Sequence, residues 1–386
     1  MKKRRMIVLG ATGSIGQSAA KVVDDLPDRL EMAGLAANQN AAGLAAQANR
    51  FRPDALCLVD ATKADELRAC LDADYHPRLL FGADGLVELV VTTEADLVLV
   101  AIIGTGGLRP ALAAIEAGRD LAVASKEILV MAGEAVMQAA SAKGVKVLPV
   151  DSEHNAIFQC LEGRDPATVR RLILTASGGP FRQWTPEQIA AATPAQALKH
   201  PTWDMGRKIS IDSATLFNKG LEMIEARWLF DVPMSRVEVV VHPQSIVHSM
   251  VEFVDSSVLA QLSHSDMCFP IQYAATYPER VANRLPPLDF GTLRSLEFEP
   301  PRLTDFPALN LARAAGEAGG TMPAVLNASN EVAVAAFLAG HIPFPRIWEV
   351  VDEVMTAHRH VAAPDLDAII HADADARSQA ARALQK

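Results

Sequence analysis

The sequence predicts an α/β fold: a Rossmann-like N-terminal domain, a mixed α+β second domain and a small C-terminal helical domain. Two observations favour it. Short apolar runs alternate with Ala-rich helical stretches as far as residue 150, and the character of the chain then changes twice. A third observation is the length, because 386 residues exceed what one hydrophobic core normally supports.

The first domain, residues 1–150, contains apolar runs without period-two alternation. Such runs, separated by helical stretches, are typical of buried parallel strands in a doubly wound sheet. The expected strands are Met6–Leu9, Met32–Ala36, Ala55–Val59, Leu97–Ile103, Asp120–Ala124 and Lys146–Val150.

The second domain, residues 151–285, has expected strands at Arg171–Thr175, Val237–His242 and Ile246–Phe253. The short Pro243-Gln244 connection predicts antiparallel pairing of the last two strands. Prolines gather in residues 286–308, which favours an extended linker. Residues 309–386 have helical spacing and no convincing strand, so we expect a third, helical domain.

Composition excludes several classes of partner. The formal charge of −10 and the absence of basic patches argue against nucleic acid and anionic membranes. The cysteines are scattered and read as buried thiols of a reducing compartment, and no apolar run reaches the length of a membrane span. Since the basic start is followed by too short an apolar stretch for a signal peptide, we expect a cytoplasmic protein.

A glycine loop, Gly10-Ala-Thr-Gly-Ser-Ile-Gly16, follows the first expected strand and opens a helical stretch from Gln17 to Leu26. Its glycines permit a tight turn and close approach of the backbone to a pyrophosphate, although a plain strand-to-helix turn is the alternative. The second strand ends in Ala36-Ala-Asn-Gln-Asn40, without the acidic residue that is typical of NAD sites. NADP is therefore favoured by elimination.

Carboxylates point to a second ligand. Asp151 and Glu153 follow an expected parallel strand, at the sheet edge where α/β proteins bind ligands. Within an expected helix from Ser213 to Asp231, capped by Asp212 or Ser213, Asn218, Glu222 and Glu225 share one face, with Lys219 at its border. Oxygen ligands favour Mg²⁺ or Mn²⁺. The alternative is a solvated helix face with ordinary intrahelical pairs.

Three other polar segments each have a functional and an ordinary interpretation. Ser177-Gly-Gly-Pro180 could hold a phosphate or form a plain turn. The stretch His200-Pro-Thr-Trp-Asp-Met-Gly206 suits a mobile lid or a loop anchored by a buried Trp. Ser125-Lys-Glu127 places a cation near the sheet edge or simply begins a helix. The histidines His154, His242, His248 and His264 lack metal spacing, and we expect structural roles for most of them.

Together these motifs resemble the 1-deoxy-D-xylulose 5-phosphate reductoisomerase family. The resemblance includes His200-Pro-x-Trp-x-Met-Gly-Arg207, Asn218-Lys-Gly-Leu-Glu222 and Leu326-Asn-Ala-Ser-Asn-Glu331, and it spans nearly the whole chain. It implies a homodimeric, NADPH-dependent oxidoreductase of non-mevalonate isoprenoid biosynthesis that requires Mg²⁺ or Mn²⁺. The substrate would be a sugar phosphate, converted to 2-C-methyl-D-erythritol 4-phosphate, and residues 151–285 would form the catalytic and dimerisation domain.

The resemblance also implies roles for individual residues. The metal ligands would be Asp151, Glu153 and Glu222, and the catalytic residues would be these three with Lys126. Substrate would contact Lys126, Ser152, Glu153, Ser177, His200, Ser213, Asn218, Lys219 and Glu222. The lid would contain His200, Trp203 and Met205. NADPH would contact Thr12, Gly13, Ser14, Ile15, Ala37, Asn38, Gln39, Ser125, Glu127 and Gly206.

Four positions differ from the pattern of the family. Asn38 stands where a lysine is common, Ser125 replaces an asparagine, and Thr202 and Asp204 replace Asn and Ser in the expected lid. Two other functions remain open from the residues alone. One is an NADP-dependent dehydrogenase of another metal-chelating hydroxy acid, against which Lys219 and the phosphate-binding serines argue. The other is a catalytically silent nucleotide-sensing protein.

Overall fold

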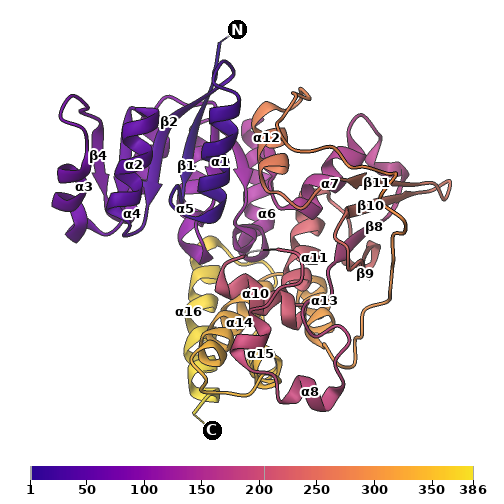
Figure 1. Cartoon of the computed structure of the whole chain (residues 1–386). Coiled ribbons are helices and arrows are strands. Elements are labelled where there is room, and N and C mark those ends of the chain that lie inside the picture. The colour runs from indigo at the N-terminus through magenta and orange to yellow at the C-terminus, as the bar shows by residue number, and fades with distance from the viewer. Residues whose placement is uncertain (1, 204, 386) are drawn as a thin grey trace. The chain divides into compact units, whose positions relative to one another are not determined.

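A seven-stranded sheet organises the N-terminal part of the chain, and the expected Rossmann-like domain is confirmed (Figure 1). The structure is a computed structural model that describes residues 2–203 and 205–385. The strand order is β4-β3-β2-β1-β5-β6-β7, and neighbouring strands pair in parallel. The strands are β1 (Arg4–Leu9), β2 (Leu30–Ala37), β3 (Ala55–Leu58), β4 (Arg78–Phe81), β5 (Leu97–Val100), β6 (Asp120–Val123) and β7 (Val147–Pro149).

The strand order runs outward from β1 in both directions, so the direction of winding reverses between β1 and β5. In open parallel sheets, ligands bind beside the carboxyl ends of the strands at such a reversal. The helices of this region are α1 (Ser14–Asp25), α2 (Ala41–Phe51), α3 (Ala64–Cys70), α4 (Gly82–Thr92), α5 (Leu108–Glu116), α6 (Lys126–Lys143) and α7 (Ser152–Leu161), with short 3₁₀ turns at Ala61–Lys63 and Gly104–Gly107.

The edge strand β4 was not expected from the sequence. It has four residues, and only Leu80 is fully buried, so its apolar signal is weak. The expectation of buried thiols is confirmed for Cys57 and Cys160. It is wrong for Cys70, which is exposed at the end of the short helix α3, and Cys268 is only partly buried. Among the described residues, no helix has both the length and the apolar character needed to cross a membrane.

A second sheet has the order β11-β10-β8-β9. Its strands are β8 (Val169–Ala176), β9 (Val237–Val241), β10 (Val247–Phe253) and β11 (Val258–Leu262). The expected pairing of β9 with β10 is wrong, because β8 lies between them, parallel to β9 and antiparallel to β10. Neighbouring strands are about 4.8 Å apart, so the connection from His242 to Ile246 is long enough to cross one strand.

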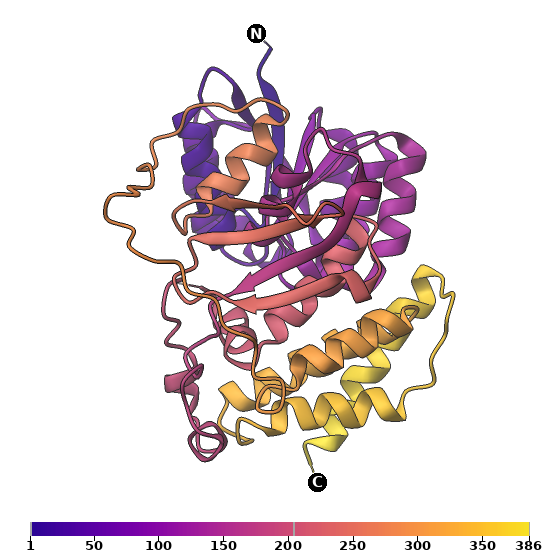
Figure 2. The ribbon, with the colours of Figure 1, turned by 90° about the vertical axis from the view of Figure 1, so that its right-hand side faces the viewer.

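The C-terminal helices pack side by side, as the orange and yellow ribbons of Figure 2 show. Large aromatic side chains, Phe306, Phe337 and Phe344, lie in one buried core with Phe217 and Leu221. Residues 309–385 contain helices and no strand, as expected. The helices are α8 (Pro186–Ala190), α9 (Pro194–Ala197), α10 (Arg207–Thr215), α11 (Phe217–Leu229), α12 (Cys268–Thr276), α13 (Ala308–Ala318), α14 (Met322–Leu338), α15 (Arg346–Ala357) and α16 (Leu366–Ala383), with 3₁₀ turns at Pro166–Thr168 and Met234–Arg236.

The chain divides into two compact units. Unit 1 contains residues 1–128, 134–155 and 266–286, and unit 2 contains residues 129–133, 156–265 and 287–386. Helix α12 thus belongs to unit 1, where it packs on α1 and β6. Residues 287–307 contain no helix or strand beyond one bridge between Val241 and Glu299. The three-domain division with boundaries at 150, 285 and 308 stays a prediction.

Candidate functional site

The glycine loop of unit 1 needs its glycines for steric reasons. Gly10 has a φ of +96°, and a Cβ there would lie 2.4 Å from the carbonyl oxygen of Ala101. A Cβ on Gly16 would lie 2.2 Å from the oxygen of Ala11. Both distances are far below van der Waals contact, so side chains at these positions would push the loop away from the sheet.

The exposed part of this loop presents backbone groups. Gly13 and Ser14 are exposed, and the N-terminus of α1 has no side-chain cap. The first N–H groups of a helix have no partner within the helix, so an uncapped N-terminus attracts an anion. The predicted cofactor residues Thr12 to Ile15 therefore lie where a pyrophosphate could bind.

The end of β2 presents exposed amide side chains, as the sequence indicates. Asn38 and Gln39 are exposed, and Asn40 caps α2 by accepting from the Gly43 N–H at 2.9 Å. One carboxylate was missed. Asp60 follows β3, and its N–H donates to the Asn38 carbonyl at 2.8 Å. Hydrogen bonds from Thr62 lower the pKa of Asp60, so this carboxylate stays ionised and remains bound to its own turn.

Neighbouring strands β6 and β7 carry the predicted cation and carboxylates of unit 1. Lys126 begins α6, and its Nζ lies 2.6 Å from Oδ2 of Asp151, which follows β7. Asp151 also accepts from the Ser152 N–H at 3.0 Å, and the Ser152 hydroxyl donates to Glu153 Oε2 at 2.6 Å. The ion pair is nearly enclosed, with 8% of the Lys126 side chain exposed. The structure thus brings Lys126, Asp151, Ser152 and Glu153 together.

Ser125 and Glu127 are buried on either side of Lys126. The Ser125 hydroxyl donates to the carbonyl of Ile102, beyond the end of β5, so it ties β6 to the neighbouring strand. This contact accounts for a small hydroxyl residue at the position, and it leaves the backbone of Ser125 at the carboxyl edge of the sheet.

In unit 2, Ser177 follows β8, and its hydroxyl contacts the His200 ring. His200 Nδ1 accepts from the backbone N–H groups of Trp203 and Thr202 at 2.9 and 3.3 Å. The neutral ring therefore carries its proton on Nε2, which lies 2.9 Å from Ser177 Oγ. Ser177 Oγ also accepts from the Gly179 N–H at 3.2 Å, so neither of these two contacts uses the hydroxyl proton of Ser177.

The same turn lies against the backbone of Ser213. Gly178 and Gly179 have φ values of +81° and +67°, and a Cβ on Gly179 would lie 2.7 Å from the Ser213 carbonyl oxygen. Ser213 is in the last turn of α10. The structure therefore brings Ser177, Gly179 and His200 next to the Ser213 backbone, and the phosphate role of this turn stays a prediction.

The expected single helix from Ser213 to Asp231 is wrong. It is two helices, α10 and α11, separated at Leu216, which has a φ of +65°. The expected capping by Asp212 or Ser213 is also wrong, because Leu216 precedes α11 and supplies no side-chain cap. The hydrophobic periodicity continues across the junction, so it conceals a change of backbone direction.

The polar face of α11 is buried, which overturns the alternative of a solvated helix face. Lys219 and Glu222 form an ion pair and are 3% and 0% exposed. Asn218 Nδ2 also donates to Glu222 Oε1 at 2.6 Å. Gly220 allows this helix to approach α13, since its Cβ would lie 2.6 Å from the Cβ of Ala312. The spacing of Asn218-Lys-Gly-Leu-Glu222 thus combines a polar cluster with close helix packing.

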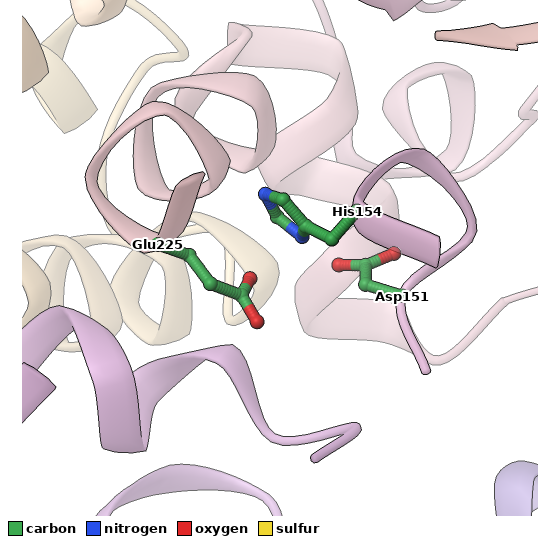
Figure 3. A group of neighbouring side chains, drawn as sticks. All are labelled: Asp151, His154 and Glu225. Atoms are coloured by element: carbon green, nitrogen blue, oxygen red, sulfur yellow. The ribbon is translucent and has the colours of Figure 1, made fainter. Parts of the chain in front are cut away.

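Two buried titratable groups were not among the predicted site residues. Figure 3 shows His154 with Asp151 at the start of α7, and Glu225 on α11. Both His154 and Glu225 are fully buried. Helical spacing placed Glu225 on the same face as Glu222 but gave it no role, and His154, which follows Glu153 directly, was expected to be structural.

The other expected lid residues, Trp203 and Met205, follow His200 along the chain, and neither lies in a helix or strand. The Trp203 ring lies 6.4 Å from the His248 ring, and Thr202 Oγ1 lies 3.5 Å from Ser245 Oγ. Met205 is half-buried and Gly206 precedes α10, while Asp204 lies outside the described residues. Three of the histidines expected to be structural contact backbone groups: His242 Nδ1 lies 2.8 Å from the Glu297 carbonyl and its Nε2 accepts from the Ile246 N–H, while His248 and His264 contact the carbonyls of Ser263 and Pro287.

The family models that match this chain, and its relatives of high sequence identity, belong to one family. Residues 6–133 match the family model "1-deoxy-D-xylulose 5-phosphate reductoisomerase", and residues 147–230 and 262–379 match two models of its C-terminal domains. The reductoisomerase of Symbiobacterium thermophilum is 54% identical over 98% of both chains. That of Pelotomaculum thermopropionicum is 50% identical over 99% of both chains.

Solved structures agree over the full length. The reductoisomerase of Zymomonas mobilis in complex with NADPH has a TM-score of 0.94 at 44% identity and covers 100% of both chains. A DOX-P reductoisomerase in complex with NADPH, fosmidomycin and magnesium has a TM-score of 0.93 at 39% identity, covering 99% of this chain and 98% of the other.

Proposed function

Because the chain belongs to the 1-deoxy-D-xylulose 5-phosphate reductoisomerase family, we propose that it converts 1-deoxy-D-xylulose 5-phosphate to 2-C-methyl-D-erythritol 4-phosphate, using NADPH and a divalent metal, in non-mevalonate isoprenoid biosynthesis. One observation of the chain itself carries the proposal. The glycine loop and the Lys126–Asp151 pair follow strands of the same parallel sheet, whose carboxyl ends share one edge. A dinucleotide and a hard cation would therefore bind close together.

NADPH would bind along this edge. The uncapped start of α1 with Thr12, Gly13, Ser14 and Ile15 would hold the pyrophosphate, and the end of β2 the adenosine ribose. The proposed contacts there are Ala37, Asn38 and Gln39, with Ser125, Glu127 and Gly206 toward the nicotinamide. NADPH is the ligand named for the solved relative from Zymomonas mobilis.

The metal would be held by Asp151, Glu153 and Glu222, each of which offers a carboxylate oxygen. Three oxygen ligands suit Mg²⁺ or Mn²⁺ better than the alternative group of Asp151, His154 and Glu225, which includes an imidazole. A bound divalent ion polarises carbonyl oxygens and lowers the pKa of neighbouring hydroxyls. Lys126 would balance part of the negative charge of the carboxylates and, with Ser152 and Glu153, contact the reacting oxygens of the substrate.

The substrate phosphate would bind in unit 2. The Ser177 hydroxyl would donate to the phosphate, and Ser213, Asn218 and Lys219 follow in the last turn of α10 and the first turn of α11. Lys219 is a buried cation, and a phosphate dianion is the kind of ligand that such a cation attracts. These groups do not react, so they would contribute orientation and remote binding energy.

His200 would link phosphate binding to the loop that contains Trp203 and Met205. Its Nε2 contacts Ser177 while its Nδ1 accepts from the Trp203 N–H, so the ring connects the phosphate-binding turn to the loop backbone. Closure of this loop over the substrate would exclude water while the carbon skeleton rearranges and hydride is delivered.

A homodimer would account for the exposed edge strand β11. Val258 and Leu259 are 47% and 36% exposed, and an unprotected apolar edge strand favours pairing with a second copy.

The cellular location follows from the cysteines. Free cysteines suit a reducing compartment, so we propose a cytoplasmic location.

The decisive experiment incubates pure protein with 1-deoxy-D-xylulose 5-phosphate, NADPH and Mn²⁺ and follows the nicotinamide absorbance with and without chelator. We expect oxidation that stops with chelator and returns with added Mn²⁺ or Mg²⁺, together with formation of the C-methyl polyol phosphate. Absence of metal-dependent oxidation would refute the proposal. NADPH oxidation that occurs only with a keto acid, the oxidised partner of a hydroxy acid, would instead indicate a dehydrogenase.

A further inference from the structure

The motif Leu326-Asn-Ala-Ser-Asn-Glu331 lies in the middle of α14 and has no part in the proposed chemistry. Its Asn330 is fully buried, and Nδ2 donates to Asp212 Oδ1 at 2.8 Å. The other oxygen of Asp212, Oδ2, lies 2.7 Å from Nζ of Lys208. The amide and the ammonium therefore each hold one oxygen of a carboxylate that is 1% exposed.

This contact has a fixed geometry. An ionised carboxylate only accepts hydrogen bonds, so the amide nitrogen of Asn330 must face Asp212. A buried carboxylate is stable only when donors surround it, and Asn330 supplies a donor from a different helix. The hydrogen bond thus fixes α10 against α14, and the backbones of these two helices also lie close to each other.

The hydrogen bond from Asn330 matters because it acts on the end of α10, next to the proposed phosphate ligand Ser213. Ser213 follows Asp212 directly, and the helix stops three residues later at Leu216. A leucine with a φ of +65° persists only when its surroundings hold it there. Local bonds, such as Thr215 Oγ1 to the Ile211 carbonyl at 3.0 Å, stabilise the last turn but do not place it relative to the rest of the unit.

Besides the apolar packing of Ile211, Ala214 and Leu216 in the core of unit 2, two contacts from outside α10 hold the turn. One is the Ser177–Gly179 segment, which lies against the Ser213 backbone, and the other is the Asn330–Asp212 hydrogen bond. We propose that Asn330 is a positioning residue that acts through Asp212 to hold Ser213 and the start of α11 in the geometry that binds the substrate phosphate. This inference rests on the proposed function, because it assigns the α10–α11 junction to the phosphate.

The test compares variants in steady-state kinetics and in inhibition by inorganic phosphate. Asn330→Ala is expected to raise KM for the ketose phosphate and Ki for inorganic phosphate by about tenfold, the effect of one lost hydrogen bond to a charged group. KM for NADPH should stay unchanged and kcat should change less than KM. Asp212→Asn should act in the same direction, and the exchanged pair Asp212→Asn with Asn330→Asp should recover most of the binding.

Ser329→Ala is the matched control. Ser329 is buried beside Asn330, but its hydroxyl donates to the Val325 carbonyl of its own helix at 2.7 Å, so its loss should leave both constants unchanged. An Asn330→Ala variant that raises both KM values together, or no more than Ser329→Ala does, overturns the inference. If Asn330→Ala does not fold, Asp212→Asn and the exchanged pair decide. A wild-type protein without turnover contradicts the proposed function, whereas turnover with unaltered variants contradicts only the positioning role.

Discussion

Glu222→Gln provides a stringent test of the site, because it removes one charge while almost preserving shape. Glu222 is fully buried, pairs with Lys219 and accepts from Asn218. Gln keeps an oxygen that can accept from Asn218, so the main loss is the counter-charge of Lys219, whose side chain is 4% exposed. Breaking a buried ion pair costs about 3–5 kcal/mol, and the retained acceptor brings the expected loss of unfolding free energy to about 2–4 kcal/mol.

That loss corresponds to a fall in Tm of roughly 5–15 °C for a unit of this size. Added inorganic phosphate should recover part of it, since a dianion near Lys219 replaces the missing charge. Because Glu222 is also a proposed metal ligand, turnover should fall at least about a hundredfold. NADPH binding should remain largely intact, because all of its proposed contacts except Gly206 lie in unit 1, away from α11 along the chain.

The assays are differential scanning calorimetry with and without phosphate, NADPH titration by fluorescence, and metal-dependent turnover. Glu238→Gln is the control: Glu238 forms an exposed pair with Arg171, with 47% of its side chain exposed, so its loss should cost less than about 1 kcal/mol. Turnover within a few-fold of wild type would remove Glu222 from the metal site. Equal losses of NADPH binding and turnover would show that the residue is structural.

Three further variants test separate parts of the structure. Lys219→Ala should raise KM for the ketose phosphate more than it lowers kcat, and an unchanged KM would remove Lys219 from the phosphate site. Gly16→Ala should weaken NADPH binding by more than about tenfold in a fluorescence titration, because its Cβ would lie 2.2 Å from the Ala11 oxygen; retained affinity would contradict the close packing of the loop. Burial raises the pKa of the Cys57 thiol from 9.0 to about 12, so folding stabilises its protonated form. The contribution of this thiol to the free energy of unfolding is complete below the unfolded pKa and is lost as pH rises toward 12. The stability of Cys57→Ala measured by urea unfolding should therefore fall less steeply between pH 9 and 12 than that of wild type, and identical slopes would show that Cys57 is not responsible.

Residues of the first sheet were predictable because their signal is local. Strands such as Met6–Leu9 and Leu97–Val100 are buried on both faces, which requires an apolar run that can be read without knowing the neighbouring strands. The glycine loop was predictable for the same reason, since a turn from strand to helix is local. The sequence did not predict the short strand β4, because a strand at the edge of a sheet is partly exposed and its residues need not form an apolar run.

Pairing across the second sheet was not predictable from the link between β9 and β10. A short connection shows only that two strand ends lie near each other, and β8 occupies the position between them. The junction at Leu216 was hidden similarly, because apolar spacing continues from α10 into α11 while the backbone turns.

The sequence by itself determined the fold class, the glycine loop and the residue types of the carboxylate and phosphate sets, because periodicity and motif spacing are properties of single elements. Only the tertiary structure decided that Lys219 and Glu222 are buried, that His200 bonds Ser177, and that Asn330 holds Asp212. Burial and hydrogen bonding depend on residues that are distant along the chain. The free energy of a buried charge is set by those partners, and the spacing of residues within one helix contains no information about them.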